Sequence, residues 1–250
     1  MAEPSTRFRA SCTVRQYAFC ANRFRLRGKS VLTQLCILDF DGTLSDTHNA
    51  IAWSIESTFD SFGVARPSHD AIADTIHAGL TMPDVMRVLH EEQLSAVEIA
   101  AWTARYRTIY DEEAMPHTEL FPGVEDALNR AKASGIRLAV VSNKGTVSLR
   151  RALAQFDIQH LIDVAVGNEP NVSKKPDPQV FINYVQPHFP HTPPAEIVVA
   201  GDTHVDILFA RAIGVRSCWA EYGYGDADTC RSLEPDMTIK KFSDFLDAIQ

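Results

Sequence analysis

The chain has 250 residues and a formal charge of −8, which argues against a nucleic-acid or membrane partner held by charge alone. Its hydrophobic content of 45% and charged content of 22% are ordinary for a globular protein, and no apolar run approaches the roughly 18–20 residues of a membrane span. The five cysteines are not spaced as metal ligands, so we expect reduced thiols in a cytoplasmic protein.

The first 30 residues differ in charge from the rest of the chain. Seven basic residues against one acid give them a formal charge of +6, which leaves −14 for the remainder. We favour a disordered basic tail, or upstream sequence that is not normally translated, with the working chain starting near Val31. An Arg-rich, acid-poor start is also typical of a transit peptide, which would make the location organellar.

Beyond residue 30, short apolar runs alternate with helical patterns, as in an α/β fold. The continuous apolar runs 35–38, 136–141 and 197–200 predict strands buried on both faces, and 164–166 and 217–219 are weaker candidates. Helices are expected over about 123–135, 146–155, 178–185 and 205–213, and from Ser243 onwards. We therefore predict a Rossmann-like, doubly wound parallel sheet.

Residues 46–120 break this alternation, because they contain no strand-like run. Ser95 and Glu98 form a capping box ahead of one helix, and Pro83 fits the first turn of another. An all-helical block of this length, inserted after the first strand, indicates a small second domain. We predict a helical cap at 46–120 and an α/β core made of 31–45 and 121–250.

Three of the predicted strands end in polar residues suited to catalysis. The first leads into Asp39, the run 136–141 into Ser142, and the run 197–200 into Gly201 and Asp202. In doubly wound sheets the ligand sits beyond the carboxyl ends of the strands. These side chains, distant in sequence, should therefore meet at one rim of the sheet.

Two further carboxylates join this set. Asp41 follows Asp39 by two residues in an extended segment, so both can face one pocket, and Gly42 allows a close backbone approach to a phosphate. Asp206, in the first turn of the next helix, would return towards Asp202. Each pair of like charges at 4 Å costs on the order of 4 kcal/mol at an effective dielectric of 20. Such a site needs a cation, and oxygen ligands suit Mg²⁺; a set of solvated turn acids is the alternative.

Lys175 lies in a loop that Pro176 and Pro178 restrain. A rigidly held ammonium would offset part of the charge of the carboxylates and of a bound phosphate. A solvated Lys-Pro loop is the alternative for this residue taken alone.

The segments 39–43, Ser142-Asn143, Lys175-Pro176 and 201–206 resemble, in this order, the four motifs of the haloacid dehalogenase superfamily. The resemblance covers about residues 32–250, and the helical insertion is similar to that superfamily's helical cap. The branch most similar in pattern is the phosphoglycolate phosphatase-like group, which the segments 121–124 and 222–225 also resemble.

The resemblance implies that Asp39 is a nucleophile that forms an aspartyl-phosphate. Asp41 would protonate the leaving oxygen and then activate water, as a separate acid and base. Mg²⁺ would be held by Asp39, the main-chain carbonyl of Asp41, Asp202 and, directly or through water, Asp206.

The resemblance also implies how the phosphoryl group is held. Ser142, the backbone at Asn143 and Lys175 would bind it, and Gly42 would let the backbone approach it. Thr43 would orient the loop. The segment with His77, Gly79 and Leu80 is similar to a substrate-selecting loop, for which an ordinary helix-helix turn is the alternative.

These roles imply a Mg²⁺-dependent phosphatase that acts on a small phosphorylated metabolite as a monomer or homodimer. The leading substrate, from resemblance alone, is 2-phosphoglycolate. A sugar phosphomutase and an inorganic pyrophosphatase of the same superfamily remain as alternatives. From a different class, a phospho-binding module without turnover is the fourth possibility. Arg87, Arg105 and Arg107 could bind a substrate carboxylate or could simply be solvated.

Overall fold

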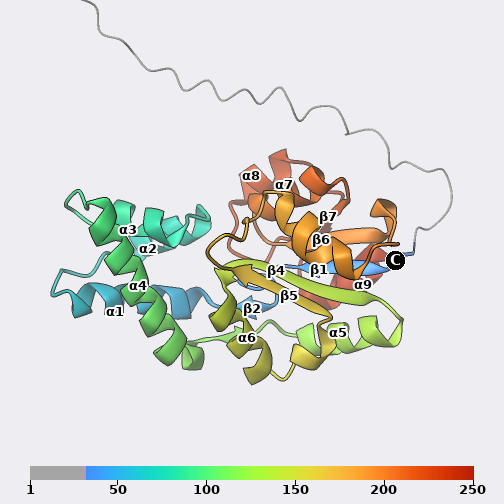
Figure 1. The fold of residues 1–250 in the computed structure, drawn as a ribbon, viewed down its shortest axis with the longest axis horizontal. Coiled ribbons are helices and arrows are strands. Elements are labelled where there is room, and N and C mark those ends of the chain that lie inside the picture. Colours follow the sequence, from blue (N-terminus) through green and yellow to red (C-terminus); the bar gives the residue numbers. More distant parts are fainter. Residues whose placement is uncertain (1–31) are drawn as a thin grey trace, which may run out of the picture. The chain divides into compact units, whose positions relative to one another are not determined.

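The computed structural model describes residues 32–250, so the expectations for residues 1–30 lie outside the described part of the chain. Six parallel strands form one sheet in the order β5-β4-β1-β6-β7-β8 (Figure 1). In chain order they are β1 (Leu35–Leu38), β4 (Arg137–Gly145), β5 (Val164–Asn168), β6 (Ile197–Gly201), β7 (Arg216–Ala220) and β8 (Met237–Ile239). This sheet confirms the predicted fold class.

Strand β1 lies at the centre of the sheet because all four of its side chains are apolar and buried. Successive side chains point to opposite faces. Cys36 and Leu38 accordingly belong to one hydrophobic core, and Leu35 and Ile37 to another. The last residue of β1, Leu38, is in register with Val140 of β4 and Ala200 of β6. Strand β4 continues from there to Gly145, so Ser142 and Asn143, which were expected to follow the strand, lie within its last residues.

Helices cover both faces of the sheet (Figure 1). Residues of α5 (Val124–Ala133), α6 (Thr146–Gln155) and α9 (Phe245–Ile249) build the core of one face. Residues of α7 (His204–Ile213), together with Phe181 and Val185, build the core of the other. Helix α7 ends at Gly214, whose φ of 71° is left-handed and favours glycine.

Four helices in residues 46–120 share a third hydrophobic core. They are α1 (His48–Ser61), α2 (His69–His77), α3 (Met82–Leu89) and α4 (Ala96–Glu113). The predicted capping box of Ser95 and Glu98 starts α4, and Pro83 lies in the first turn of α3. The expectation of helices alone is wrong at the ends of this segment. There β2 (Ser45–Asp46) pairs antiparallel with β3 (Glu119–Leu120), a ladder too short to leave a pattern in the sequence.

The other differences from the expected elements are local. The helix expected over 178–185 is a helical segment that contains a π-helical turn (Phe181–Val185) and continues as a 3₁₀ turn (Gln186–His188). Helix α8 (Ala227–Ser232) and strand β8 were not expected. Short 3₁₀ turns occupy Met115–His117, Gln159–Leu161, Pro194–Glu196 and Phe242–Asp244. In residues 32–250, the structure contains no helix with the length and apolar character to span a bilayer.

Candidate active site

The carboxyl edge of the sheet forms one wall of a cavity of about 610 Å³. Asp39 follows β1 and donates its backbone N–H to the carbonyl of Ala200 at 2.9 Å, which fixes it beside the end of β6. The cavity is lined at this edge by Asp39, Asp41, Ser142, Asn143, Lys175, Asp202 and Asp206. The structure thus brings together the polar strand endings that the sequence predicts to meet.

Lys175 lies between two of the carboxylates. Its Nζ is 2.7 Å from Oδ1 of Asp39 and donates to Oδ1 of Asp206 at 2.6 Å. The Lys175 side chain is only 4% exposed. Burial alone would lower the pKa of this ammonium, but Asp206 and Asp39 together raise it above its ordinary value. Lys175 is therefore a fixed positive charge.

Asp206 is positioned by the start of α7, as predicted. Its Oδ2 accepts from the backbone N–H of Thr203 at 3.1 Å and from the Thr203 hydroxyl at 2.9 Å. A carboxylate in the first turn of a helix satisfies N–H groups that have no intrahelical partner. The turn directs the other oxygen of Asp206 to Lys175.

Asp202 is almost completely buried, and among residues 32–250 both hydrogen-bond donors to its carboxylate are neutral. The Thr43 hydroxyl donates to its Oδ1 at 3.2 Å, and the backbone N–H of Tyr224 donates to its Oδ2 at 2.8 Å. Gly42 and Gly223 allow this packing, since a Cβ on either would lie 2.2 Å from an Asp202 side-chain atom. Burial, followed by repulsion from Asp206 and Asp39, raises the pKa of Asp202 well above its ordinary value.

The three carboxylates have the composition of a divalent-cation site. One oxygen from each of Asp39, Asp202 and Asp206 lies within 4.8 Å of the others. Burial, partly offset by Lys175, raises the pKa of Asp39 to about 6, with further raising contributions from Asp206 and Asp41. One ammonium beside three buried carboxylates leaves an excess of negative charge. Mg²⁺, which prefers oxygen ligands, fits both the donors and this charge.

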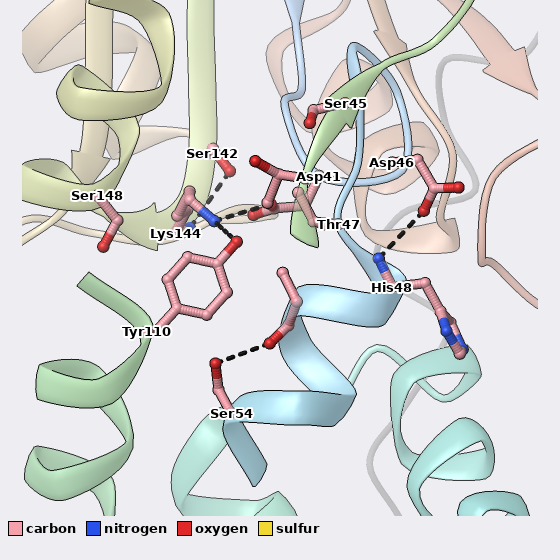
Figure 2. Close-up of polar contacts among 12 residues, drawn as sticks. Asp41, Ser45, Asp46, Thr47, His48, Ser54, Tyr110, Ser142, Lys144 and Ser148 are labelled. Atoms are coloured by element: carbon pink, nitrogen blue, oxygen red, sulfur yellow. Dashed lines mark hydrogen bonds and ion pairs between the residues drawn. The ribbon is translucent and has the colours of Figure 1, made fainter. Parts of the chain in front are cut away.

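A second lysine, Lys144, contacts Asp41 (Figure 2). Its Nζ donates to Oδ1 of Asp41 at 2.9 Å and to the hydroxyl of Tyr110, on α4, at 2.6 Å. Its backbone N–H donates to Oγ of Ser142 at 3.2 Å. The sequence reasoning missed Lys144, although its position directly after Ser142-Asn143 at a strand end was a usable signal.

Asn143 braces the loop that carries Lys175. Its side-chain amide donates to the backbone carbonyl of Lys175 at 3.3 Å, and its Oδ1 accepts from the backbone N–H of Lys175 at 3.1 Å. This reciprocal pair fixes the start of the Lys175 side chain. The prediction for Asn143 concerned its backbone, so the bracing contact of the side chain is an addition.

The helical block contributes a second wall of the cavity. Gly79 and Leu80, from the predicted substrate-selecting segment, line it, whereas His77 is not among its lining residues. The ring of His77 lies instead 6.3 Å from that of His48. Arg107 of α4 also lines the cavity, whereas Arg87 and Arg105 are not among its lining residues.

The loop after β7 connects Asp202 to the beginning of the helical block. The Tyr224 hydroxyl accepts from the backbone N–H groups of Thr47 and His48 at 2.5 and 2.9 Å and donates to Oδ1 of Asp46 at 2.8 Å. The same residue holds Asp202 through its backbone. The segment 222–225 was noted in the sequence only as a resemblance. It therefore joins the acidic site to the linker, residues 46–48, through which the chain enters the helical block.

The chain is similar to known phosphoglycolate phosphatases. A phosphoglycolate phosphatase from Psychrobacter arcticus is 27% identical over 219 residues, which cover 86% of this chain and 94% of the relative. A solved structure described as a predicted phosphoglycolate phosphatase from Haemophilus somnus is 26% identical, with a TM-score of 0.73, and the match covers 88% of this chain and 99% of that one.

A haloacid dehalogenase-like family hydrolase from Streptococcus pneumoniae has the same fold, with a TM-score of 0.76 at 24% identity, over 87% of this chain and 99% of that one. The family model described as haloacid dehalogenase-like hydrolase matches residues 36–220. That match spans both the acidic strand endings and the helical block. The chain belongs to the haloacid dehalogenase-like hydrolase family.

Proposed function

We propose that this phosphatase of the haloacid dehalogenase-like family hydrolyses a small phosphomonoester through an aspartyl-phosphate on Asp39, with Mg²⁺ as its cofactor. The leading substrate is 2-phosphoglycolate, the ester after which the curated relatives are named. The observation that carries the proposal is the contact of Asp39 with Lys175 in a cavity that Asp41 also lines, with an oxygen each of Asp202 and Asp206 within 4.8 Å of one of Asp39.

In the first step an oxygen of Asp39 attacks phosphorus, and the bond between phosphorus and the ester oxygen breaks. The carboxyl group of Asp41 gives its proton to the leaving oxygen, so an alcohol departs. In the second step Asp41 takes a proton from water as that water attacks phosphorus, which releases phosphate and restores Asp39. This division of work requires a nucleophile and a separate acid and base within reach of one reacting group.

Asp39, the backbone carbonyl of Asp41, Asp202 and Asp206 would hold Mg²⁺, which when bound offsets the charge of the carboxylates and of the phosphate. Lys175 supplies the fixed positive charge beside Asp39. Ser142 and the backbone at Asn143 and Gly42 would donate to the phosphoryl oxygens, while Thr43 holds Asp202 in place. Positioned charge of this kind provides most of the catalysis in phosphoryl transfer.

The helical block would act as the cap predicted for residues 46–120, on a core of 31–45 and 121–250. Closure over the substrate would exclude bulk water from the reacting phosphoryl group. Support comes from the cavity, whose lining includes Gly79 and Leu80 of the block as well as the acids of the sheet. These two residues would then contact the leaving group.

The test is phosphate release from 2-phosphoglycolate and p-nitrophenyl phosphate, with Mg²⁺ or with EDTA. Wild type should be active only with the metal, and Asp39→Asn should abolish turnover while keeping the circular dichroism spectrum of the folded chain. Asp228→Asn, at a fully solvated position on α8, is the matched control and should keep wild-type activity. Appreciable hydrolysis by Asp39→Asn would refute the nucleophile, and metal-independent hydrolysis by wild type would refute the cofactor.

A further inference from the structure

Lys144 is a buried cation at the cavity wall. Its side chain is 7% exposed, and its Nζ lies 4.0 Å from the centre of the Tyr110 ring as well as within hydrogen-bond distance of Asp41 and Tyr110 (Figure 2). An ammonium has three N–H donors, and among residues 32–250 these two oxygens use two of them. The third remains for a group inside the cavity, which Lys144 lines.

The other cations at this cavity are placed differently. Lys175 already lies between two carboxylates, Asp39 and Asp206. Arg107 and Lys174 line the cavity but are exposed to solvent. A buried charge interacts more strongly with a ligand than a solvated one, because the local dielectric is lower. Of these lining residues, Lys144 is therefore the one best placed to bind a negatively charged leaving group.

Distances limit how long that leaving group can be. The ester oxygen must come within about 3 Å of Asp41 to receive its proton. Lys144 Nζ is 2.9 Å from Oδ1 of Asp41, so an ester oxygen that receives its proton from this same oxygen lies at most about 6 Å from Nζ. A carboxylate attached to the carbon next to the ester oxygen spans about 3 Å of this, and a charge-assisted hydrogen bond about 2.8 Å. A two-carbon acid fills the gap.

The start of α6 adds to the attraction for an anion. Lys144 and Gly145 lead directly into this helix, whose first turn has no side-chain cap and whose residues 146–148 line the same cavity. Free N–H groups at a helix start and the helix dipole both favour negative charge. The field of α6 therefore acts in the same direction as the ammonium of Lys144.

We propose that Lys144 binds the carboxylate of the leaving group and so selects phosphate esters of short 2-hydroxy acids. The inference rests on the proposed function, because it places the leaving oxygen at Asp41. It goes beyond that function because it assigns substrate selection to Lys144. None of the proposed catalytic steps requires this residue.

The experiment compares 2-phosphoglycolate with 2-hydroxyethyl phosphate, an ester of similar size whose leaving group is uncharged, in wild type, Lys144→Met and Lys144→Arg. Wild type should prefer the carboxylate ester in kcat/KM. Lys144→Met should lose about 10–100-fold more kcat/KM on this ester than on the other, mainly through KM, because one charge-assisted hydrogen bond is removed. Lys144→Arg should keep part of the preference. Lys240→Met, at an exposed position away from the cavity, is the control.

Equal losses on both esters would overturn the inference and leave Lys144 as a residue that only positions Asp41. If Lys144→Met does not fold, the inference is tested instead by product inhibition of wild type and of Lys144→Arg. Glycolate must then inhibit p-nitrophenyl phosphate hydrolysis more than ethylene glycol does, and Lys144→Arg must change that inhibition; failure of either overturns the inference. A wild type that hydrolyses no phosphomonoester would overturn the proposed function, and the inference with it.

Discussion

Replacement of Lys175 by methionine should destabilise the chain in the absence of metal, and Mg²⁺ should restore part of the loss. The ammonium lies 2.7 Å from Asp39 and 2.6 Å from Asp206; Lys175 and Asp206 are buried, and the side chain of Asp39 is 11% exposed. Methionine has a similar length but no charge. Two carboxylates would then face each other, with Asp202 nearby, and nothing to neutralise them.

The size of the effect follows from these distances. At an effective dielectric of 20, a contact of 2.7 Å corresponds to an attraction of about 6 kcal/mol, from which the cost of burying the ammonium must be subtracted. Measured losses after removal of one partner of a buried ion pair are about 3–5 kcal/mol. Because domains are stable by about 5–15 kcal/mol, Lys175→Met should unfold at a clearly lower denaturant concentration.

Urea unfolding measured in EDTA and in excess Mg²⁺ tests this reasoning. Binding at 100 times the dissociation constant stabilises a folded state by about 2.7 kcal/mol. The variant should gain more than wild type, because its site carries one more net negative charge. Lys174→Met, an exposed lysine in the same loop, should unfold like wild type under both conditions.

Equal stability of Lys175→Met and wild type in EDTA would refute the assignment of Lys175 as the neutralising charge. A loss that Mg²⁺ does not reduce at all would refute the idea that carboxylate repulsion causes it. Turnover should fall by at least about 10²-fold whether or not Mg²⁺ repairs the stability, because the metal does not replace a donor at the developing charge.

Three further substitutions test other parts of the structure. Gly223→Ala should abolish activity, because its Cβ would lie 2.2 Å from the side chain of Asp202, whereas Gly135→Ala has open space and should lose only about 1 kcal/mol of stability. Asp163→Asn should lose about 1 kcal/mol at pH 7 and less at pH 3 in denaturant titrations. Tyr224→Phe should raise the KM more than it lowers kcat, since its hydroxyl holds the linker into the helical block.

The pH dependence of Asp163 has a definite sign. Burial raises the pKa of Asp163, but the N–H of Leu138 and the ion pairs with Lys132 and Arg137 outweigh it and lower the pKa. A lowered pKa stabilises the folded chain above the unfolded pKa of about 4, and this contribution is lost as the pH falls through the folded value. A loss in Asp163→Asn that is as large at pH 3 as at pH 7 would contradict this.

The other two predictions can fail as clearly. Full activity of Gly223→Ala would mean that Asp202 does not need its observed place. An unchanged KM in Tyr224→Phe, with a melting temperature equal to that of wild type, would mean that the hydroxyl has no part in holding the linker in the active enzyme.

The central strands could be predicted from the sequence because a strand buried on both faces must be continuously apolar. Strand β1 was expected at 35–38 and lies there, and β6 differs from the expected run by one residue. Asp206 could be placed because one helical turn returns a side chain towards the preceding loop. Lys175 could be placed beside the acids only through the resemblance, since a lysine in a proline-rich loop is common.

What the sequence did not reveal depends on contacts between distant segments. Lys144 and Tyr110 are 34 positions apart, and neither belongs to a spacing that indicates catalysis. The short ladder of β2 and β3 joins residues 74 positions apart by a few hydrogen bonds. Strand β8 has only three residues, and its pairing with β7 compensates for a weak local pattern.

The β2–β3 ladder has a consequence for how such a molecule can diversify. The backbone N–H of Phe121 donates to the carbonyl of Leu44 at 3.0 Å, and Ser45 pairs with Leu120. The polypeptide thus leaves the α/β core and returns to it at adjacent points. Lengthening a loop between fixed ends costs little entropy. Any segment whose ends meet in this way can be exchanged for another without moving Asp39. New specificities can therefore arise by grafting, while the reaction chemistry is inherited unchanged.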